Sequence, residues 1–167
     1  RSASYGIGMR AVEAACMARE GRGLEETVER IRAIRNAGRV YFLVDTLEYL
    51  QKGGRIGKAQ AVLGSLLNIK PILTIDDEGE VASVDKVRGS KKAVQRIVEL
   101  YRRDYDSARE IVLDICHSND MPAAETVAEA IREHYKVRSL QYVTLGPVIG
   151  AHTGPGTVGI FLRYADL

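Results

Sequence analysis

The sequence predicts an α/β protein with one six-stranded sheet, mixed and largely antiparallel, which helices cover on one face. Three observations lead to this class. Several segments carry apolar residues at helical spacing, and apolar runs of strand length separate those segments. One alternating stretch also turns at Asp77-Glu78-Gly79, as a β-hairpin does. The composition, with 46% hydrophobic and 28% charged residues among 167, is typical of a soluble globular chain of one domain or slightly more.

The first part of the chain is predicted to be helical. Residues 8–20 and 24–37 each fit a helix, the second with four apolar residues at helical spacing. The pattern changes after Gly38, where a continuous apolar run begins. We therefore divide the chain into a helical segment, residues 1–39, and a main α/β domain, residues 40–167.

The main domain is expected to alternate between strands and helices. A short helical piece that Gly53 and Gly54 interrupt should follow the first strand. The predicted strands are residues 40–44, the two arms of the hairpin within 71–84, and residues 110–116, 140–146 and 156–164. The predicted helices are residues 58–68, residues 91–103 with Ser90 as the capping residue, and residues 121–135 with Pro122 in the first turn.

The stretch "GPVIGAHTGPGTVGIF", residues 146–161, holds five of the sixteen glycines and two of the four prolines. Glycine lets a backbone approach a ligand closely, and free backbone N–H groups can bind an anion. His152 adds a ring donor and Thr153 a hydroxyl, and both suit a carboxylate or phosphate group. The same residues also fit a tight connection in which His152 only caps a backbone carbonyl. Residue chemistry alone leaves both interpretations open.

The segment "LQKGGRIGK", residues 50–58, superficially resembles a phosphate-binding loop. The required Gly-Lys-Ser/Thr ending is absent, because Ala59 follows Lys58, and no strand precedes the glycines. A nucleotide site is therefore not expected here. Arg55, on the Gly-Gly turn, could donate to a ligand or partner, or could be a solvated surface side chain.

Other chemistry-bearing residues give weaker patterns. Cys116 and His117 are neighbours on a predicted strand and should point to opposite faces, which excludes a nucleophile–base pair. The acidic residues 76–80 fall on a hairpin tip, where such side chains are normally solvated. Neither Cys nor His spacing matches a metal site, and no catalytic residues or cofactor are predicted. The net charge of +2 is spread along the chain, which disfavours nucleic-acid binding, and no apolar run is long enough for a membrane span.

Three strings together carry a family resemblance: "VDTLEYLQKGGRIGKAQAVLGSLLNIKPILTIDDEGEV", "KVRGSKKA" and "LGPVIGAHTGPGTVGIFL". In this order and spacing they resemble the DegV family, as does the opening "RSASYGIGMRAVEAACMAREG". The resemblance implies a bacterial carrier of two α/β domains that binds a long-chain fatty acid in a tunnel. It further implies that a separate ATP-dependent fatty acid kinase phosphorylates the bound acid for phospholipid synthesis.

The resemblance also assigns residues. His152 would lie near the fatty acid carboxylate with Thr153 and Gly154 as its loop neighbours, and Arg55 is kept as a fourth ligand-binding candidate. This chain would be the C-terminal domain with the last helical segment of a truncated N-terminal domain. The carboxylate site would then be incomplete, lipid retention weak, and dimerisation through the exposed interdomain surface favoured.

Two other functions stay open at this stage. The chain could belong to a small-molecule kinase or phosphatase whose chemistry resides in the missing region, or it could be a structural interaction domain. The two cysteines, Cys16 and Cys116, are far apart and unpatterned, which indicates free thiols in a reducing cytoplasm.

Overall fold

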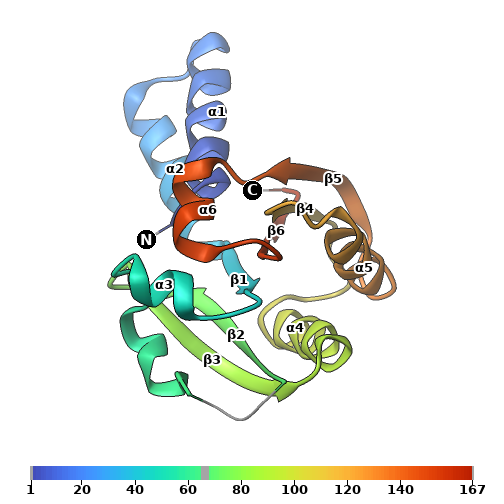
Figure 1. Ribbon diagram of the computed structural model, residues 1–167. Coiled ribbons are helices and arrows are strands. Elements are labelled where there is room, and N and C mark those ends of the chain that lie inside the picture. Colours follow the sequence, from blue (N-terminus) through green and yellow to red (C-terminus); the bar gives the residue numbers. More distant parts are fainter. Residues whose placement is uncertain (1, 65–67, 167) are drawn as a thin grey trace.

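The computed structural model describes residues 2–64 and 68–166 (Figure 1). Its strands form a single sheet of six, in the spatial order β3-β2-β1-β6-β4-β5. The strands are β1 (Arg39–Leu43), β2 (Ile69–Ile75), β3 (Val81–Arg88), β4 (Ile111–His117), β5 (Val137–Thr144) and β6 (Val158–Tyr164). The helices are α1 (Tyr5–Arg19), α2 (Leu24–Ala37), α3 (Glu48–Lys52), the 3-10 helix η1 (Gly57–Val62), α4 (Ser90–Asp104), α5 (Met121–Arg132) and α6 (Pro147–Thr153).

The sheet is mixed. Strands β4 and β5 pair in parallel, and every other neighbouring pair is antiparallel. The last strand, β6, lies in the interior between β1 and β4, although those two strands are distant in sequence. This arrangement confirms the predicted mixed, largely antiparallel α/β sheet.

One face of the sheet packs against α4 and α5, which lie side by side in Figure 1. Alternate residues of each strand point to this face because the side-chain period of a strand is two. Ile111, Leu113 and Ile115 of β4, with Ile160 and Leu162 of β6, are at most 1% exposed there. This is the larger of the two hydrophobic cores.

The opposite face is only partly covered. A second core joins Phe42, Val44 and Leu73 to residues from α3 and η1, among them Leu50 and Ala59. This core lies over β1 and β2. It does not extend over β6 and β4, the neighbouring strands on the same face.

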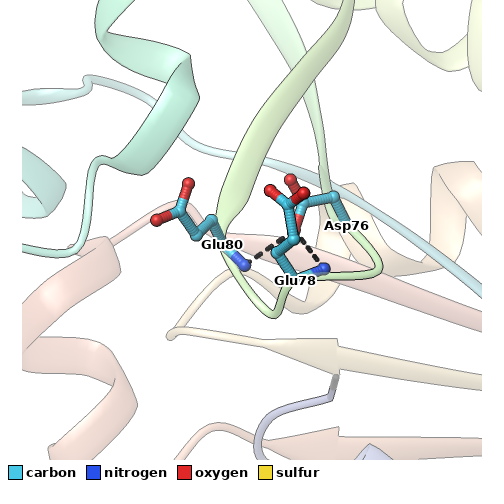
Figure 2. A group of neighbouring side chains, drawn as sticks. All are labelled: Asp76, Glu78 and Glu80. Atoms are coloured by element: carbon cyan, nitrogen blue, oxygen red, sulfur yellow. Dashed lines mark hydrogen bonds between the residues drawn. The ribbon is translucent and has the colours of Figure 1, made fainter.

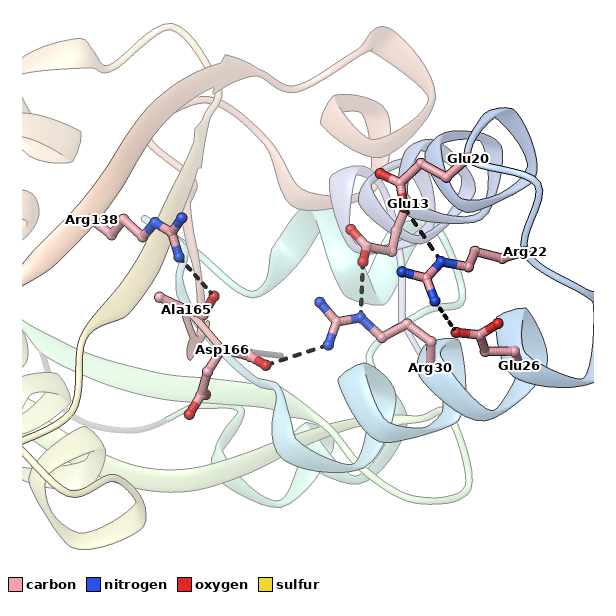
Figure 3. Close-up of polar contacts among 8 residues, drawn as sticks. All are labelled: Glu13, Glu20, Arg22, Glu26, Arg30, Arg138, Ala165 and Asp166. Atoms are coloured by element: carbon pink, nitrogen blue, oxygen red, sulfur yellow. Dashed lines mark hydrogen bonds and ion pairs between the residues drawn. The ribbon is translucent and has the colours of Figure 1, made fainter.

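Helices α1 and α2 form a hairpin that is tied to the end of the chain by polar contacts (Figure 3). The Arg30 Nε atom donates to Glu13 Oε1 at 2.9 Å, which joins the two helices, and an Arg30 terminal nitrogen donates to the Asp166 carbonyl at 3.4 Å. Arg22, in the connection between α1 and α2, pairs with Glu26 in the first turn of α2 at 2.8 Å. Arg30 therefore links the two helices to each other and to the segment that follows β6.

Three local expectations were wrong. Residues 57–62 form a 3-10 helix in place of an α-helix over 58–68, and residues 65–67 lie outside the described residues. Gly89, with φ of 85°, is the N-cap of α4, so Ser90 is the first helical residue and makes no capping bond. The glycine-rich stretch before β6 contains a short helix, α6, where a loop was expected.

Candidate ligand-binding cavity

A cavity of about 380 Å³ lies on the open part of the sheet. We call it the His152 cavity. Its walls come from four places: the chain before α1, the β1–β6–β4 part of the sheet, the α3–η1 region with the hairpin, and α6. The residues that decide its character are Phe42, Cys116, Gly159 and Phe161 from the strands, and Arg55 and His152 from the segments above them. Its size falls in the usual range for small-molecule sites.

The sequence fixes helix α6 at both ends. Pro147 occupies the first turn, where its missing N–H costs no hydrogen bond. Gly154 ends the helix with φ of 80°, a conformation that few other residues adopt. The buried hydroxyl of Thr157 donates toward the carbonyl oxygens of Thr153 and Gly154 at 3.0 and 2.9 Å, which satisfies groups at the end of the helix. His152, in the last turn, is therefore held by a well-defined backbone.

His152 packs directly against α3. A methyl group at Gly53 would collide with the imidazole Nδ1 atom, so only glycine at position 53 permits this approach. Nδ1 is buried and has no hydrogen-bond partner among the described residues. The imidazole can donate or accept a hydrogen bond, and His152 lines the cavity, so its ring is a polar group within reach of a ligand there.

The four residues predicted to bind ligand take different positions. His152, Thr153 and Arg55 all line the cavity. The Thr153 hydroxyl donates to the Ile149 carbonyl at 3.1 Å, so its hydrogen is already engaged. Gly154 is not among the lining residues, and a methyl group there would collide with the Tyr49 ring. Gly154 therefore contributes by letting α6 approach α3.

Arg55 offers the cationic group at this cavity. Its guanidinium makes long contacts of 3.5 and 3.4 Å with the Gly53 and Gly54 carbonyl oxygens, and the side chain is exposed. Contacts of this length leave the guanidinium free to turn toward an anion. Arg55 and His152 thus place two groups able to interact with a carboxylate on one cavity that is otherwise mainly apolar.

The sheet supplies an apolar floor. Phe42, Gly159 and Cys116 lie directly opposite one another on β1, β6 and β4. Burial raises the pKa of the Cys116 thiol to about 12, with the nearby Asp114 as the second cause, so the thiol stays neutral and behaves as a small apolar group.

A second cavity, of about 490 Å³, lies beyond Phe161, and we call it the Arg10 cavity. Both cavities border Phe161, Val40 and Ile75. The Arg10 cavity is polar, with cationic side chains from α1, α2 and the strands, and with the buried Asp114 on its wall. Burial raises the pKa of the Asp114 carboxyl. This second space is therefore chemically distinct from the apolar His152 cavity.

The acidic hairpin between β2 and β3 gathers three carboxylates (Figure 2). One ligand atom from each of Asp76, Glu78 and Glu80 lies within 4.8 Å of the others. The Lys58 ammonium pairs with Asp76 at 2.6 Å and also with Glu78, and Asp76 accepts bonds from the backbone N–H groups of Glu78 and Glu80. Because Lys58 already pairs with two of the three carboxylates and Asp76 accepts two backbone bonds, the contacts are those of a stabilised turn.

Among residues 2–64 and 68–166, no helix has the length and apolar character needed to cross a bilayer. The same part of the chain contains two cysteines, Cys16 and Cys116, and both are free thiols.

Comparison with known proteins decides the family. The family model described as "Uncharacterised protein, DegV family" matches residues 1–165. The chain belongs to the DegV family. A DegV domain-containing protein of Clostridium perfringens is 37% identical over 161 residues, which are 96% of this chain and 55% of that protein. The chain thus spans about half the length of the curated DegV relatives that it matches.

Solved DegV structures share the fold. A DegV family protein from Thermus thermophilus, described as fatty acid binding, superimposes with a TM-score of 0.90 at 38% identity, over 98% of this chain and 58% of that one. DegV from Bacillus subtilis, described as a fatty acid binding protein, gives a TM-score of 0.77 at 34% identity over 95% of this chain and 56% of that one. Fatty acid binding is thus described for members of this family with the same fold.

Proposed function

We propose that this protein binds one long-chain fatty acid in the His152 cavity and acts as a carrier without chemistry of its own. The observation that carries the proposal is the composition of that cavity. An apolar floor on the sheet meets a histidine and an arginine that line the same cavity. This suits an amphipathic anion, and fatty acid binding is described for the Thermus and Bacillus relatives.

The physical chemistry of a fatty acid matches both parts of the cavity. Each CH₂ group removed from water contributes about 0.8 kcal/mol, so the tail supplies most of the affinity. A buried carboxylate needs hydrogen-bond donors, since an unpaired charge is costly in an apolar place. The His152 ring N–H and the Arg55 guanidinium are the donors in this proposal, with Thr153 and Gly154 holding the end of α6 in place.

The proposal includes a kinase as partner. A separate ATP-dependent fatty acid kinase would phosphorylate the presented carboxylate, and the acyl phosphate would enter phospholipid synthesis. Arg55 and Arg88 are both exposed and are the candidate residues for the kinase-facing surface. A cytoplasmic location belongs to the same proposal, because ATP is available there and free thiols persist.

We also propose that residues 1–39 belong to a preceding N-terminal domain and that residues 40–167 form the lipid-tail-binding domain. Helices α1 and α2 expose Ile7, Val12 and Leu24 at 58, 63 and 80%. Three exposed apolar side chains on one hairpin support the proposal that another body covers this surface. In the 167-residue chain alone, a second copy could cover it, and the head-group site would then lack donors from the other domain.

The first test is extraction of lipid from the purified complete product of the gene. Denaturation in organic solvent followed by mass spectrometry should release stoichiometric long-chain fatty acid. The 167-residue chain alone should retain less. A folded protein that yields no lipid and also refuses added fatty acid would exclude the carrier function and favour a structural domain or an enzyme part.

The second test concerns the head group. His152→Ala should weaken fatty acid binding by roughly 10- to 100-fold, because a hydrogen bond to a charged group is worth about 1.5–3 kcal/mol. His134→Ala is the matched control, since His134 is exposed and lies outside the cavity. Isothermal titration with a long-chain fatty acid measures both. Equal affinity of the two variants would remove His152 from the site.

A further inference from the structure

Gly159 lies at an unusual place for a glycine. It is in the interior of β6, and it pairs with Phe42 on one side and with Cys116 on the other. Glycine weakens the interior of a strand, because it packs no side chain and loses more backbone freedom on folding. Its backbone here is extended and has no positive φ, so the strand geometry would accept another residue. The absent side chain therefore needs another explanation.

Packing against the protein itself does not require glycine at this position. A methyl group added there would lie 3.8 Å from Phe42 Cβ, and 3.9 Å from both Cys116 Cβ and Phe161 Cε2. These are ordinary van der Waals distances, so the methyl would fit without displacing a neighbour. This differs from Gly53 and Gly154, where an added methyl would collide with a ring.

The unfilled space belongs to the His152 cavity. Gly159 and the three residues that would surround its methyl group all line that cavity. The next residues along β6, Val158 and Ile160, point to the opposite face and are at most 2% exposed. On the core side of β6 the side chains of Val158 and Ile160 are fully packed. On the cavity side the strand carries no side chain at position 159, in the cavity floor.

We propose that Gly159 is a specificity-determining residue, which sets the width of the slot and admits fatty acids with a wide cross-section. The chemical class is the long-chain acid with a cis double bond or a methyl branch. This inference rests on the fatty acid binding proposed above. Such chains need more room at the bend or branch than a straight saturated chain does. One methylene in an apolar pocket discriminates between ligands by roughly 10- to 200-fold.

The test is a comparison of two acids on two variants. Palmitic acid is straight, and palmitoleic acid has equal length with one cis double bond. For Gly159→Ala, the affinity ratio of palmitoleic to palmitic acid should fall about 10-fold or more below that of the unchanged protein. Gly8→Ala is the control, since nothing lies within 4 Å of a methyl group at that helical position. Its ratio should be unchanged. Titration calorimetry on the complete gene product measures the ratios.

The outcomes separate the two proposals. If the unchanged protein binds neither acid, the carrier function itself fails. If it binds both and Gly159→Ala keeps the same ratio, Gly159 does not set specificity. Cys116→Ala offers a second variant that stays informative if Gly159→Ala does not fold. This substitution removes the thiol that lies opposite Gly159 and so widens the cavity floor at the same place. The affinity ratio of palmitoleic to palmitic acid should then rise, and an unchanged ratio would overturn the inference.

Discussion

Successive residues of β6 face two very different surroundings. Ile160 and Leu162 lie among the side chains of the larger core, whereas Gly159 and Phe161 border the His152 cavity. The first face is filled by aliphatic and tyrosine side chains that exclude water. The second carries a glycine, a thiol and a ring around space that the protein does not fill. The comparison indicates that one face of the same strands stabilises the fold and the other accommodates a ligand.

The largest effect should come from the filled face. Ile160→Ala removes a fully buried side chain, and such changes cost about 2–5 kcal/mol through lost burial and an unfilled cavity. The free energy of unfolding, measured in urea, should fall by that amount. Ligand affinity of the molecules that remain folded should not change, because Ile160 is absent from the cavity wall.

Phe161→Ala, one position further along the strand, is the matched comparison. Phe161 is only partly buried, so its removal should cost less stability than that of Ile160, but it should change fatty acid affinity. If both variants lost the same stability and both kept full affinity, the division between the two faces would be wrong.

The next effect concerns the junction of α3 and α6. Gly154→Ala places a side chain at φ of 80° and ψ of 175°, a conformation that costs about 1–3 kcal/mol for other residues. The added methyl also meets the Tyr49 ring. Thermal unfolding should show the loss of stability, and affinity should fall with it because His152 moves. Gly146→Ala, with φ of −66° and open space around the added methyl, is the control and should have little effect.

The smallest effect is a pH dependence from the cavity side of the sheet. Burial raises the pKa of Asp114 above its ordinary 3.8, so the folded state holds its proton more tightly than the unfolded state does. The contribution of Asp114 to the free energy of unfolding is fully present below pH 3.8, and it is lost as the pH rises through the pKa of the folded state. The loss amounts to about 1.4 kcal/mol for each unit of pKa difference.

Asp114→Asn should abolish that slope. Urea unfolding of both proteins, repeated between acid and neutral pH, gives the difference directly. A wild-type protein that becomes more stable relative to the variant as the pH rises would show that ionic contacts of Asp114 outweigh its burial.

The sequence predicted an element correctly where a single local pattern, such as hydrophobic periodicity or turn residues, determines that element. The strands and the long helices followed from hydrophobic period, and the hairpin from its turn residues. The 3-10 helix was missed because Ile56, Ala59 and Val62 are spaced by three residues, which suits a 3-10 helix as well as an α-helix. The N-cap of α4 was misplaced because Gly89 takes a conformation that sequence pattern does not reveal.

Helix α6 was missed because its stability is tertiary. Seven residues with prolines and glycines around them have low helix propensity, and the helix depends on the contacts of His152 with Gly53 and of Gly154 with Tyr49. The cavity floor was missed for a related reason. Phe42, Gly159 and Cys116 are ordinary residues on three strands, and only the register of the sheet brings them together.

The position of β6 has a consequence for the order in which the chain folds. This strand is synthesised after β1 and β4, yet it lies between them and provides much of the cavity floor. Until it emerges from the ribosome, β1 and β4 each present an unpaired edge, and such edges are prone to aggregation. Contacts between segments that are distant in sequence also slow folding, because a long loop must close first. The nascent protein therefore completes the floor of the His152 cavity only after β6 has joined the sheet.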